Sequence, residues 1–265
     1  MKKFWFILTA LVATCFLVAC SGSQGVSPKT IKEKKKIVVA TESEFAPFEF
    51  KSLVNGKDTL VGADIELAKA IGEKLGVKVE FSVMSFDNVL ASVQSGKADV
   101  AIAGISVTDE RKKVYDFSDS YYTSENVVIV KKDKVNDYTS TDSLAKQTVG
   151  TQKGSVQETV AKKQISKASV VSLASNGEMI NELKSGQLQA VVLEKAIAEG
   201  YIAQNDDLTL ANFNLKSDGS DAYAVATRKG ADDLLKEINA VIKETKDSGK
   251  FNQWLKEAST YKQSK

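Results

Sequence analysis

The sequence predicts an α/β fold divided between two lobes. From Ile37 onward, short apolar runs typical of strands alternate with amphipathic segments of helical length. This alternation indicates parallel sheets built from right-handed strand–helix–strand units. A second observation is an internal repeat: "ASVQSGKADVAIAG" and "NELKSGQLQAVVLE" both predict a helix, a Ser-Gly pair and a buried strand. Two similar halves within about 230 residues favour two lobes over one large sheet.

The first twenty residues have the pattern of a bacterial leader. Lys2 and Lys3 precede an apolar run from Phe4 to Leu17, which is too short and wrongly flanked for a membrane-spanning helix. The run ends in "LVAC", which resembles the bacterial lipobox and implies cleavage before Cys20 and lipid attachment to that cysteine. We therefore expect a signal peptide over 1–19 and a membrane anchor at Cys20. A plain signal peptide with a chance cysteine is the alternative.

Composition narrows the classes of partner. The 265 residues are 43% hydrophobic and 26% charged, as in an ordinary globular protein of one or two domains. Basic residues number 36 and acidic residues 34, so removal of a leader with Lys2 and Lys3 leaves a formal net charge of zero. Nothing in this balance indicates a nucleic-acid partner. Loss of Cys15 with the leader also leaves no pair of cysteines for an internal disulfide.

The next segment, 20–36, is expected to be a lipid-anchored flexible tether. It reads "CSGSQGVSPKTIKEKKK", with a Ser/Gly/Pro start, a lysine cluster and no apolar period. Its lysines are interpreted as solvated, although contact with anionic headgroups is the other interpretation.

The folded elements follow in order. "KIVVATE" predicts a buried strand, and "FEFKSLVNGKDTLVG" predicts a hairpin around Asn55-Gly56. "ADIELAKAIGEKLG" predicts a helix with Asp64 as N-cap and Gly76 beyond its end. Strand, helix and strand are then predicted by "VKVEFSV", "FDNVLASVQSG" and "KADVAIAG". The second half repeats the pattern in "QTVGTQKGS", "VQETVAKK", "ASVVSL", "NGEMINELKSG" and "LQAVVLE".

Polar residues follow several of these strands at their carboxyl ends, where open α/β sheets bind ligands. Arg111 is informative because Arg111 and Arg228 are the two arginines in a lysine-rich chain. A guanidinium grips a carboxylate with two parallel hydrogen bonds, which an ammonium cannot do. Ser106 and the Gly104 backbone could add donors to the same anion. The alternative is a short helix capped by Thr108 or Asp109, with Arg111 solvated.

Other candidates carry similar alternatives. Gly154 and Ser155 lie at a strand-to-helix turn that could bind an anion, or Ser155 could simply cap the helix. Glu194 and Glu42 each follow a buried strand and could hold an ammonium, or Glu194 could be an ordinary first-turn acid. Two aromatics near the same strand ends, Phe45 and Phe86, fit either a binding pocket or the core.

Catalytic chemistry finds little support. The chain has no histidine, which excludes Ser-His and Cys-His schemes and histidine metal sites. No GxxxxGK[ST] or GxGxxG motif occurs, and no cofactor or metal is expected. Two carboxylates such as Glu42 and Glu194 could transfer protons, but such pairs are common in sequences.

Three segments together resemble a known family: "IVVATESEFAPFEF", "ADVAIAGISVTDERKKVYDFSDSYYTS" and "SGKFNQWLKEA". They are similar to the polar amino-acid-binding proteins of bacterial ABC importers (solute-binding protein family 3), in particular those for glutamine and for lysine, arginine, ornithine or histidine. The resemblance covers Ile37 to about Ala258. It implies a type II periplasmic-binding-protein clamshell, each lobe a mixed sheet flanked by helices. Lobe 1 would comprise 37–121 plus 223–265 and lobe 2 would comprise 125–219, with hinge strands near Tyr122–Glu125 and Ser220–Tyr223.

By this resemblance, Arg111 binds the α-carboxylate of an amino acid with help from Ser106 and the turn at Gly154 and Ser155. Glu194, Ser106 and the Gly104 backbone bind the α-ammonium. Phe45 and Phe86 flank the ligand side chain, and Glu42 faces its polar end. Glu42 and Glu194 stand where the family usually has Asp, and Val156 stands where relatives often carry Thr.

The implied function is that of a non-enzymatic binding lipoprotein on the outer face of the cell membrane. It would be a monomer that captures a polar or cationic L-amino acid (arginine, lysine, histidine or glutamine) and delivers it to an ABC permease with its ATPase subunits. A dehydratase-like enzyme on the same fold, acting on a prephenate- or arogenate-like acid, is one alternative. A surface adhesin is another.

Overall fold

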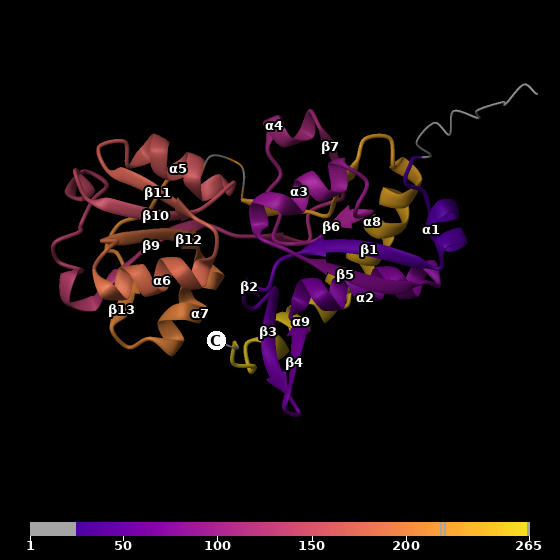
Figure 1. The fold of residues 1–265 in the computed structure, drawn as a ribbon, viewed down its shortest axis with the longest axis horizontal. Helices are drawn as coiled ribbons and strands as arrows, with labels where there is room; N and C mark the ends of the chain where they lie inside the picture. The colour runs from indigo at the N-terminus through magenta and orange to yellow at the C-terminus, as the bar shows by residue number, and fades with distance from the viewer. Residues whose placement is uncertain (1–24, 218, 220, 264–265) are drawn as a thin grey trace, which may run out of the picture.

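The computed structural model describes residues 25–217, 219 and 221–263, so the predicted signal peptide and Cys20 lie outside the described residues. Two five-stranded sheets organise the chain, and Figure 1 shows them side by side along the long axis. We define lobe 1 as the sheet in the order β5-β1-β6-β15-β7 with its helices, and lobe 2 as the sheet in the order β11-β10-β12-β9-β13 with its helices.

Lobe 1 takes strands from both ends of the chain. They are β1 (Lys36–Thr41), β5 (Lys78–Val83), β6 (Val100–Ala101), β7 (Tyr115–Phe117) and β15 (Ala226–Arg228). The strands β5 and β6 run parallel to β1, whereas β15 is antiparallel to β6 and β7. The helices of this lobe are α2 (Ala63–Leu75), α3 (Phe86–Gln94), α4 (Asp109–Lys112), α8 (Asp232–Asp247) and α9 (Lys250–Ala258).

Lobe 2 is one continuous stretch of chain. Its strands are β9 (Asn126–Lys131), β10 (Thr148–Gln152), β11 (Ser169–Leu173), β12 (Ala190–Glu194) and β13 (Leu208–Leu210). Its helices are α5 (Val156–Gln164), α6 (Asn176–Ser185) and α7 (Lys195–Gln204), with short 3-10 turns η1 (Lys132–Lys134) and η2 (Asp142–Leu144). Strands β11, β10 and β12 are parallel, and β9 pairs antiparallel with β12.

The chain crosses between the lobes twice, on paired strands. The crossing strand β8 (Tyr122–Thr123) pairs antiparallel with β14 (Ala222–Tyr223). Both strands lie within the segments that the sequence predicts as hinges. Aromatic rings surround the crossing: the Phe48 ring centroid is 4.9 Å from that of Tyr122 and 5.4 Å from that of Tyr223. The largest core cluster runs through these rings from one lobe into the other.

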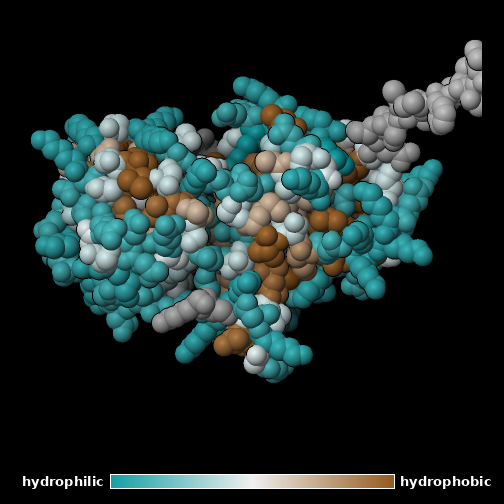
Figure 2. Space-filling model, viewed as in Figure 1, coloured by the Kyte–Doolittle hydropathy of each residue, from teal (hydrophilic) through white to brown (hydrophobic). Residues whose placement is uncertain are grey.

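A small sheet projects from lobe 1 beside the crossing (Figure 1). It consists of β2 (Glu44–Phe45), β3 (Glu49–Val54) and β4 (Lys57–Val61), paired antiparallel in that order. The predicted hairpin is confirmed, because Asn55 and Gly56 form its two-residue loop with φ values of 51° and 75°. Hydrophilic side chains cover most of the face in Figure 2. Among the described residues, no helix is long and apolar enough to span a bilayer.

Two expectations from the sequence are wrong. Residues 28–34, expected within a flexible tether, form helix α1 (Pro28–Lys34), and Ile31 is fully buried against the lobe 1 core. The helix itself is stabilised by the Ser27 cap and by Pro28 at its first position. Asp64 is also not the N-cap of α2, which begins after Gly62, although Gly76 ends that helix in the predicted left-handed conformation.

The docking of α1 predicts a measurable contribution to stability. Ile31→Ala should lower the free energy of unfolding by about 2–4 kcal/mol, because it removes a buried side chain and leaves a cavity. Urea unfolding of the chain from Ser21 onward measures this difference. Lys32→Ala, on the exposed side of the same helix, should change it by less than about 0.5 kcal/mol. Equal, small effects of both substitutions would show that this segment is a tether after all.

Candidate functional site

The sequence-predicted residues meet where the carboxyl ends of the two sheets face each other. In lobe 1, Glu42 follows β1 directly. In lobe 2, Glu194 ends β12, and Gln152 ends β10 just before the turn to α5. Hydrogen bonds join the lobes here: Gln152 Nε2 donates to the two Glu42 carboxyl oxygens at 3.1 and 3.3 Å, and Arg111 Nη2 donates to the Gly154 carbonyl at 3.1 Å. We call this set of contacts the interlobe seam.

Arg111 lies in the interlobe seam and is held on three sides. Its Nη1 donates to the Ser106 carbonyl at 2.9 Å, and its Cζ lies 5.8 Å from the centroid of the Phe86 ring. Its backbone N–H donates to Thr108 Oγ1 at 3.1 Å, so the predicted cap at Thr108 exists as well. Burial of the guanidinium lowers the pKa of Arg111. The two interpretations of this segment are therefore compatible, because the cap positions the arginine.

Glu42 of lobe 1 is buried at the interlobe seam, where it contacts Gln152 of lobe 2. Its carboxyl group accepts from the Gln152 amide at 3.1 and 3.3 Å. Burial raises the pKa of Glu42 to about 8, and repulsion from Glu194 and Glu44 adds to the shift, whereas the Gln152 bond opposes it. In the arrangement seen here, the Gln152 amide occupies the position in which a cationic or amide group of a ligand would best pair with Glu42.

Glu194 is the second buried acid that the sequence singles out. Its backbone forms the N-cap of α7, but its side chain makes no capping hydrogen bond, so a capping role does not explain its position. Burial raises the pKa of Glu194 to about 7, while hydrogen bonds and the positive charge of Arg111 lower it. Gln157, the first-turn residue of α5, is buried beside it and donates to Asn126 Oδ1 at 2.7 Å. An ammonium group would remove the cost of ionising Glu194.

Two further acids, Glu49 and Asp64, were not identified from the sequence. Both are fully buried. Asp64 Oδ2 accepts from Tyr121 Oη at 2.7 Å and from the Gly104 N–H at 3.0 Å. Burial raises the pKa of Asp64 to about 6 and that of Glu49 well above its ordinary range. Among the described residues, no donor forms a hydrogen bond with either Glu49 oxygen. Burial and the nearby charge of Asp64 therefore favour the protonated form of Glu49.

One signal for these acids was available. Glu49 stands between Phe48 and Phe50 on a strand, and an acid among large apolar residues is a candidate buried charge. Asp64 was instead interpreted as a helix cap. Gln152 carried no signal, because its importance depends on a contact with a residue of the other lobe.

The remaining candidates are placed at the same strand ends with partly different partners. The Gly104 N–H donates to Asp64 Oδ2 and is not free for an anion in this arrangement, whereas the implied contact of the Gly104 backbone with an ammonium stays a prediction. Gly104 has a φ of +54°, and an added Cβ would lie 2.5 Å from the Phe45 ring, so a side chain is excluded there. Phe45 itself is buried and packs against Phe48 and Tyr223. Ser106 meets Arg111 through its carbonyl.

Ser155 caps helix α5, as the alternative interpretation predicted. Its Oγ accepts from the Glu158 N–H at 3.3 Å and donates to the Gln152 carbonyl at 2.7 Å. Arg111, Gly154 and Ser155 also line a cavity of about 550 Å³ between α4 and α5, which is large enough for a small molecule. The residues described as lining this cavity include the Arg111 guanidinium and the N-terminus of α5 but none of the four buried acids. A guanidinium beside a helix N-terminus suits a ligand that carries a carboxylate.

The buried acids predict how stability depends on pH. A carboxyl group whose pKa is higher in the folded than in the unfolded chain is harder to ionise when folded. Its ionisation at rising pH therefore destabilises the folded state. The free energy of unfolding of the ligand-free chain should therefore fall as the pH rises from about 5 to about 8. Glu42→Gln removes one of these ionisations, so urea unfolding of this variant should show a smaller loss over the same range. Glu73→Gln, at an exposed position, serves as the control and should keep the full loss. An unchanged loss in Glu42→Gln would contradict the assignment.

Comparison with known proteins agrees with this architecture. Residues 37–258 match the family model described as bacterial extracellular solute-binding proteins, family 3. The chain is 34% identical to the arginine-binding extracellular protein ArtP of Bacillus subtilis, over 97% of each chain. It is similar to a crystal structure of the amino acid ABC transporter substrate-binding protein AbpA of Streptococcus pneumoniae bound to L-arginine, with a TM-score of 0.85 and 50% identity over 88% of this chain and 98% of that one.

A second crystal structure, of an amino acid ABC transporter substrate-binding protein from Streptococcus pneumoniae bound to L-arginine, gives a TM-score of 0.88 and 46% identity, over 91% of this chain and 100% of that one. The predicted two-lobe fold of type II periplasmic binding proteins is thereby confirmed. With the family model covering the chain from β1 to the end of α9, the protein belongs to family 3 of the bacterial extracellular solute-binding proteins.

Proposed function

We propose that this chain is the substrate-binding lipoprotein of an amino-acid ABC importer and that its ligand is a cationic L-amino acid, with L-arginine as the first candidate. The observation that carries the proposal is that the Arg111 guanidinium and two buried carboxyl groups, those of Glu42 and Glu194, lie at the same interlobe seam. The relatives named for arginine binding support the choice of ligand.

The ligand would be bound by charge at three points. Arg111 and the N-terminus of α5 at Ser155 receive the α-carboxylate. Glu194 receives the α-ammonium, and Glu42 receives the cationic end of the side chain. Phe86, beneath the Arg111 guanidinium, and Phe45 provide apolar contact for the methylene chain. Each charge-assisted bond contributes about 1.5–3 kcal/mol, so a few of them account for micromolar affinity, about 8 kcal/mol.

A cationic side chain is favoured over an amide by the charges of the site. An uncharged glutamine side chain leaves an ionised Glu42 without a counter-charge, and burial disfavours that state. A guanidinium or ammonium group instead pairs with it and lowers its pKa. The ligand also has to displace the Gln152 amide from Glu42. A charge-assisted hydrogen bond from a cationic ligand is stronger than the hydrogen bond from the neutral amide that it replaces.

Ligand binding would act by closing the lobes. The Gln152–Glu42 and Arg111–Gly154 bonds already hold the two lobes together across the seam. Entry of a ligand requires these bonds to open about the paired strands β8 and β14, and the bound ligand then replaces them with stronger contacts to both lobes. The closed form would deliver the amino acid to a membrane permease.

Membrane attachment through Cys20 is part of the proposal. The "LVAC" sequence after an apolar run supports lipid attachment at that cysteine, outside the described residues. The enzyme alternative is less favoured because the relatives reported above are named as binding proteins. Turnover of a prephenate- or arogenate-like acid would support it, and the lack of any stabilisation by amino acids would support the adhesin.

Replacing Arg111 tests the proposed carboxylate contact. Arg111→Lys keeps the charge but loses the planar pair of donors, so affinity for L-arginine should fall at least about 30-fold, equivalent to about 2 kcal/mol. Isothermal titration calorimetry measures the dissociation constant. Arg228→Lys alters the other arginine of the chain, outside the interlobe seam, and should bind normally. Normal binding by Arg111→Lys would rule out the contact even if the ligand is correct.

Replacing Glu42 tests the side-chain contact separately. Glu42→Gln should weaken L-arginine binding by about 10- to 100-fold, because it removes the charge that pairs with the guanidinium. L-citrulline has nearly the same shape without the charge, so its affinity should change much less. The ratio of the two dissociation constants, measured by calorimetry, is the decisive quantity. A similar loss for both ligands would place the side chain's polar end elsewhere.

A further inference from the structure

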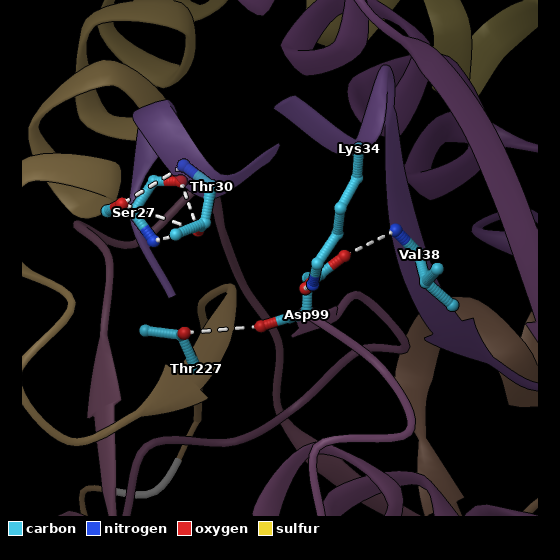
Figure 3. A network of polar contacts seen from close by, with 6 residues as sticks. All are labelled: Ser27, Thr30, Lys34, Val38, Asp99 and Thr227. Atoms are coloured by element: carbon cyan, nitrogen blue, oxygen red, sulfur yellow. Dashed lines mark hydrogen bonds and ion pairs between the residues drawn. The ribbon is translucent and has the colours of Figure 1, made fainter. Parts of the chain in front are cut away.

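Helix α1 is fixed to lobe 1 by more than its one apolar contact. Figure 3 shows the network around it. Lys34 Nζ donates to Asp99 Oδ1 at 3.3 Å, and Asp99 Oδ2 accepts from the Val38 N–H at 2.9 Å. The Asp99 carbonyl accepts from Thr227 Oγ1 at 3.2 Å, which links the same residue to β15. Through Asp99, the helix is therefore connected to β1 and β15, two interior strands of the lobe 1 sheet.

The start of α1 is fixed as well. The Thr30 N–H donates to Ser27 Oγ at 3.2 Å, and the Ser27 N–H donates to Thr30 Oγ1 at 3.1 Å. This reciprocal cap satisfies two backbone donors. Val26, just before it, is 4% exposed and belongs to the core. Val26 thus packs against the core ten residues before β1 begins.

The outward side of this fixed element is strongly basic. We define the basic face as Lys29, Lys32, Lys35 and Lys78, all of which are exposed. Lys78 adjoins Lys35, because its N–H donates to the Lys35 carbonyl at 3.2 Å. None of the ion pairs found among the described residues includes a lysine of the basic face.

Acidic residues within the segment from Pro28 to Lys36 do not cancel this excess. Two other lysines of the same segment form ion pairs: Lys34 with Asp99 and Lys36 with Glu80. Glu33 is the one acid between Pro28 and Lys36. In Figure 1, α1 lies at the end of lobe 1 farthest from lobe 2, so this charge is far from the interlobe seam. It therefore cannot serve the bound amino acid, and a role in steering a cationic ligand would require the opposite sign.

We propose that the basic face of α1 is a docking surface for an anionic phospholipid membrane. A fixed group of unpaired lysines attracts anionic headgroups without any cost of ordering a flexible segment. The position along the chain agrees with this partner. Five residues separate Cys20 from Val26, so a lipid on Cys20 would hold the basic face within about 20 Å of the bilayer at full extension.

The proposal shares with the proposed function only the membrane location, and it does not depend on the bound amino acid. Its consequence is an orientation: the membrane would contact the end of lobe 1, and lobe 2, which carries Gln152 and Glu194, would stay free to open and close. A lipid anchor alone does not fix this orientation, because it leaves the domain free to rotate.

The test uses the chain from Ser21 onward, which contains every helix and strand described above and carries no lipid. Its binding to vesicles of phosphatidylcholine with about one third phosphatidylglycerol is measured by co-sedimentation, in parallel with pure phosphatidylcholine vesicles. We expect binding to the anionic vesicles only, and loss of that binding as salt is raised from about 0.05 to about 0.5 M.

Matched variants locate the surface. Lys29→Gln, Lys32→Gln and Lys35→Gln together should reduce the partition coefficient at least about 20-fold, because each lysine near an anionic surface contributes roughly fivefold. Lys132→Gln, Lys146→Gln and Lys163→Gln remove the same charge from exposed positions of lobe 2 and should leave binding within about twofold.

Three results would overturn the proposal: no binding to anionic vesicles, equal binding to neutral vesicles, or equal losses in the two triple variants. Calorimetry with L-arginine on the same proteins keeps this outcome separate from the proposed function, because neither set of lysines lies in the interlobe seam. A failure of vesicle binding with normal amino-acid binding would reject the docking surface alone.

Discussion

The burial of acidic groups between the two lobes is the constraint on which the rest of this site depends. Glu42, Glu49, Asp64 and Glu194 are almost fully removed from water, while Arg111 is the one guanidinium nearby. Ionised carboxylates without counter-charges are costly in such surroundings. The ligand-free protein meets this cost by protonation and by an amide from Gln152. A cationic ligand meets it by direct pairing, so ligand preference and pH sensitivity have the same physical origin.

The two lobes divide the work of binding unequally. Lobe 1 supplies Arg111 on α4, Glu42 directly after β1 and Asp64 on α2, and the small sheet attached to it supplies Glu49 at the start of β3. Lobe 2 supplies Glu194, the Gln152 amide and the α5 N-terminus. Because opposite charges and their partners are distributed over both lobes, a ligand satisfies all of them only when the lobes are together. Closure and recognition are therefore one event.

Local sequence patterns predicted most of the fold. The hairpin at Asn55-Gly56 and the helix end at Gly76 follow from turn and cap chemistry, which depends on a few neighbouring residues. Arg111 was predictable because arginine is rare in this chain. The contact of Gln152 with Glu42 was not, since it joins residues 110 positions apart. Helix α1 was missed because its lysines outweigh the single buried Ile31 in any average over the segment.

The geometry of Arg111 also explains why this position needs an arginine before any ligand arrives. One Nη donates to the Ser106 carbonyl of lobe 1 and the other to the Gly154 carbonyl of lobe 2, at 2.9 and 3.1 Å. A guanidinium has five N–H donors in a fixed plane, so the bond to Ser106, which lies within lobe 1, orients it when the lobes open while the other donors remain for a carboxylate. An ammonium in the same place would have to give up its carbonyl partners to bind an anion. The side chain is thus ordered before the ligand binds, so binding loses less conformational entropy and the affinity is higher.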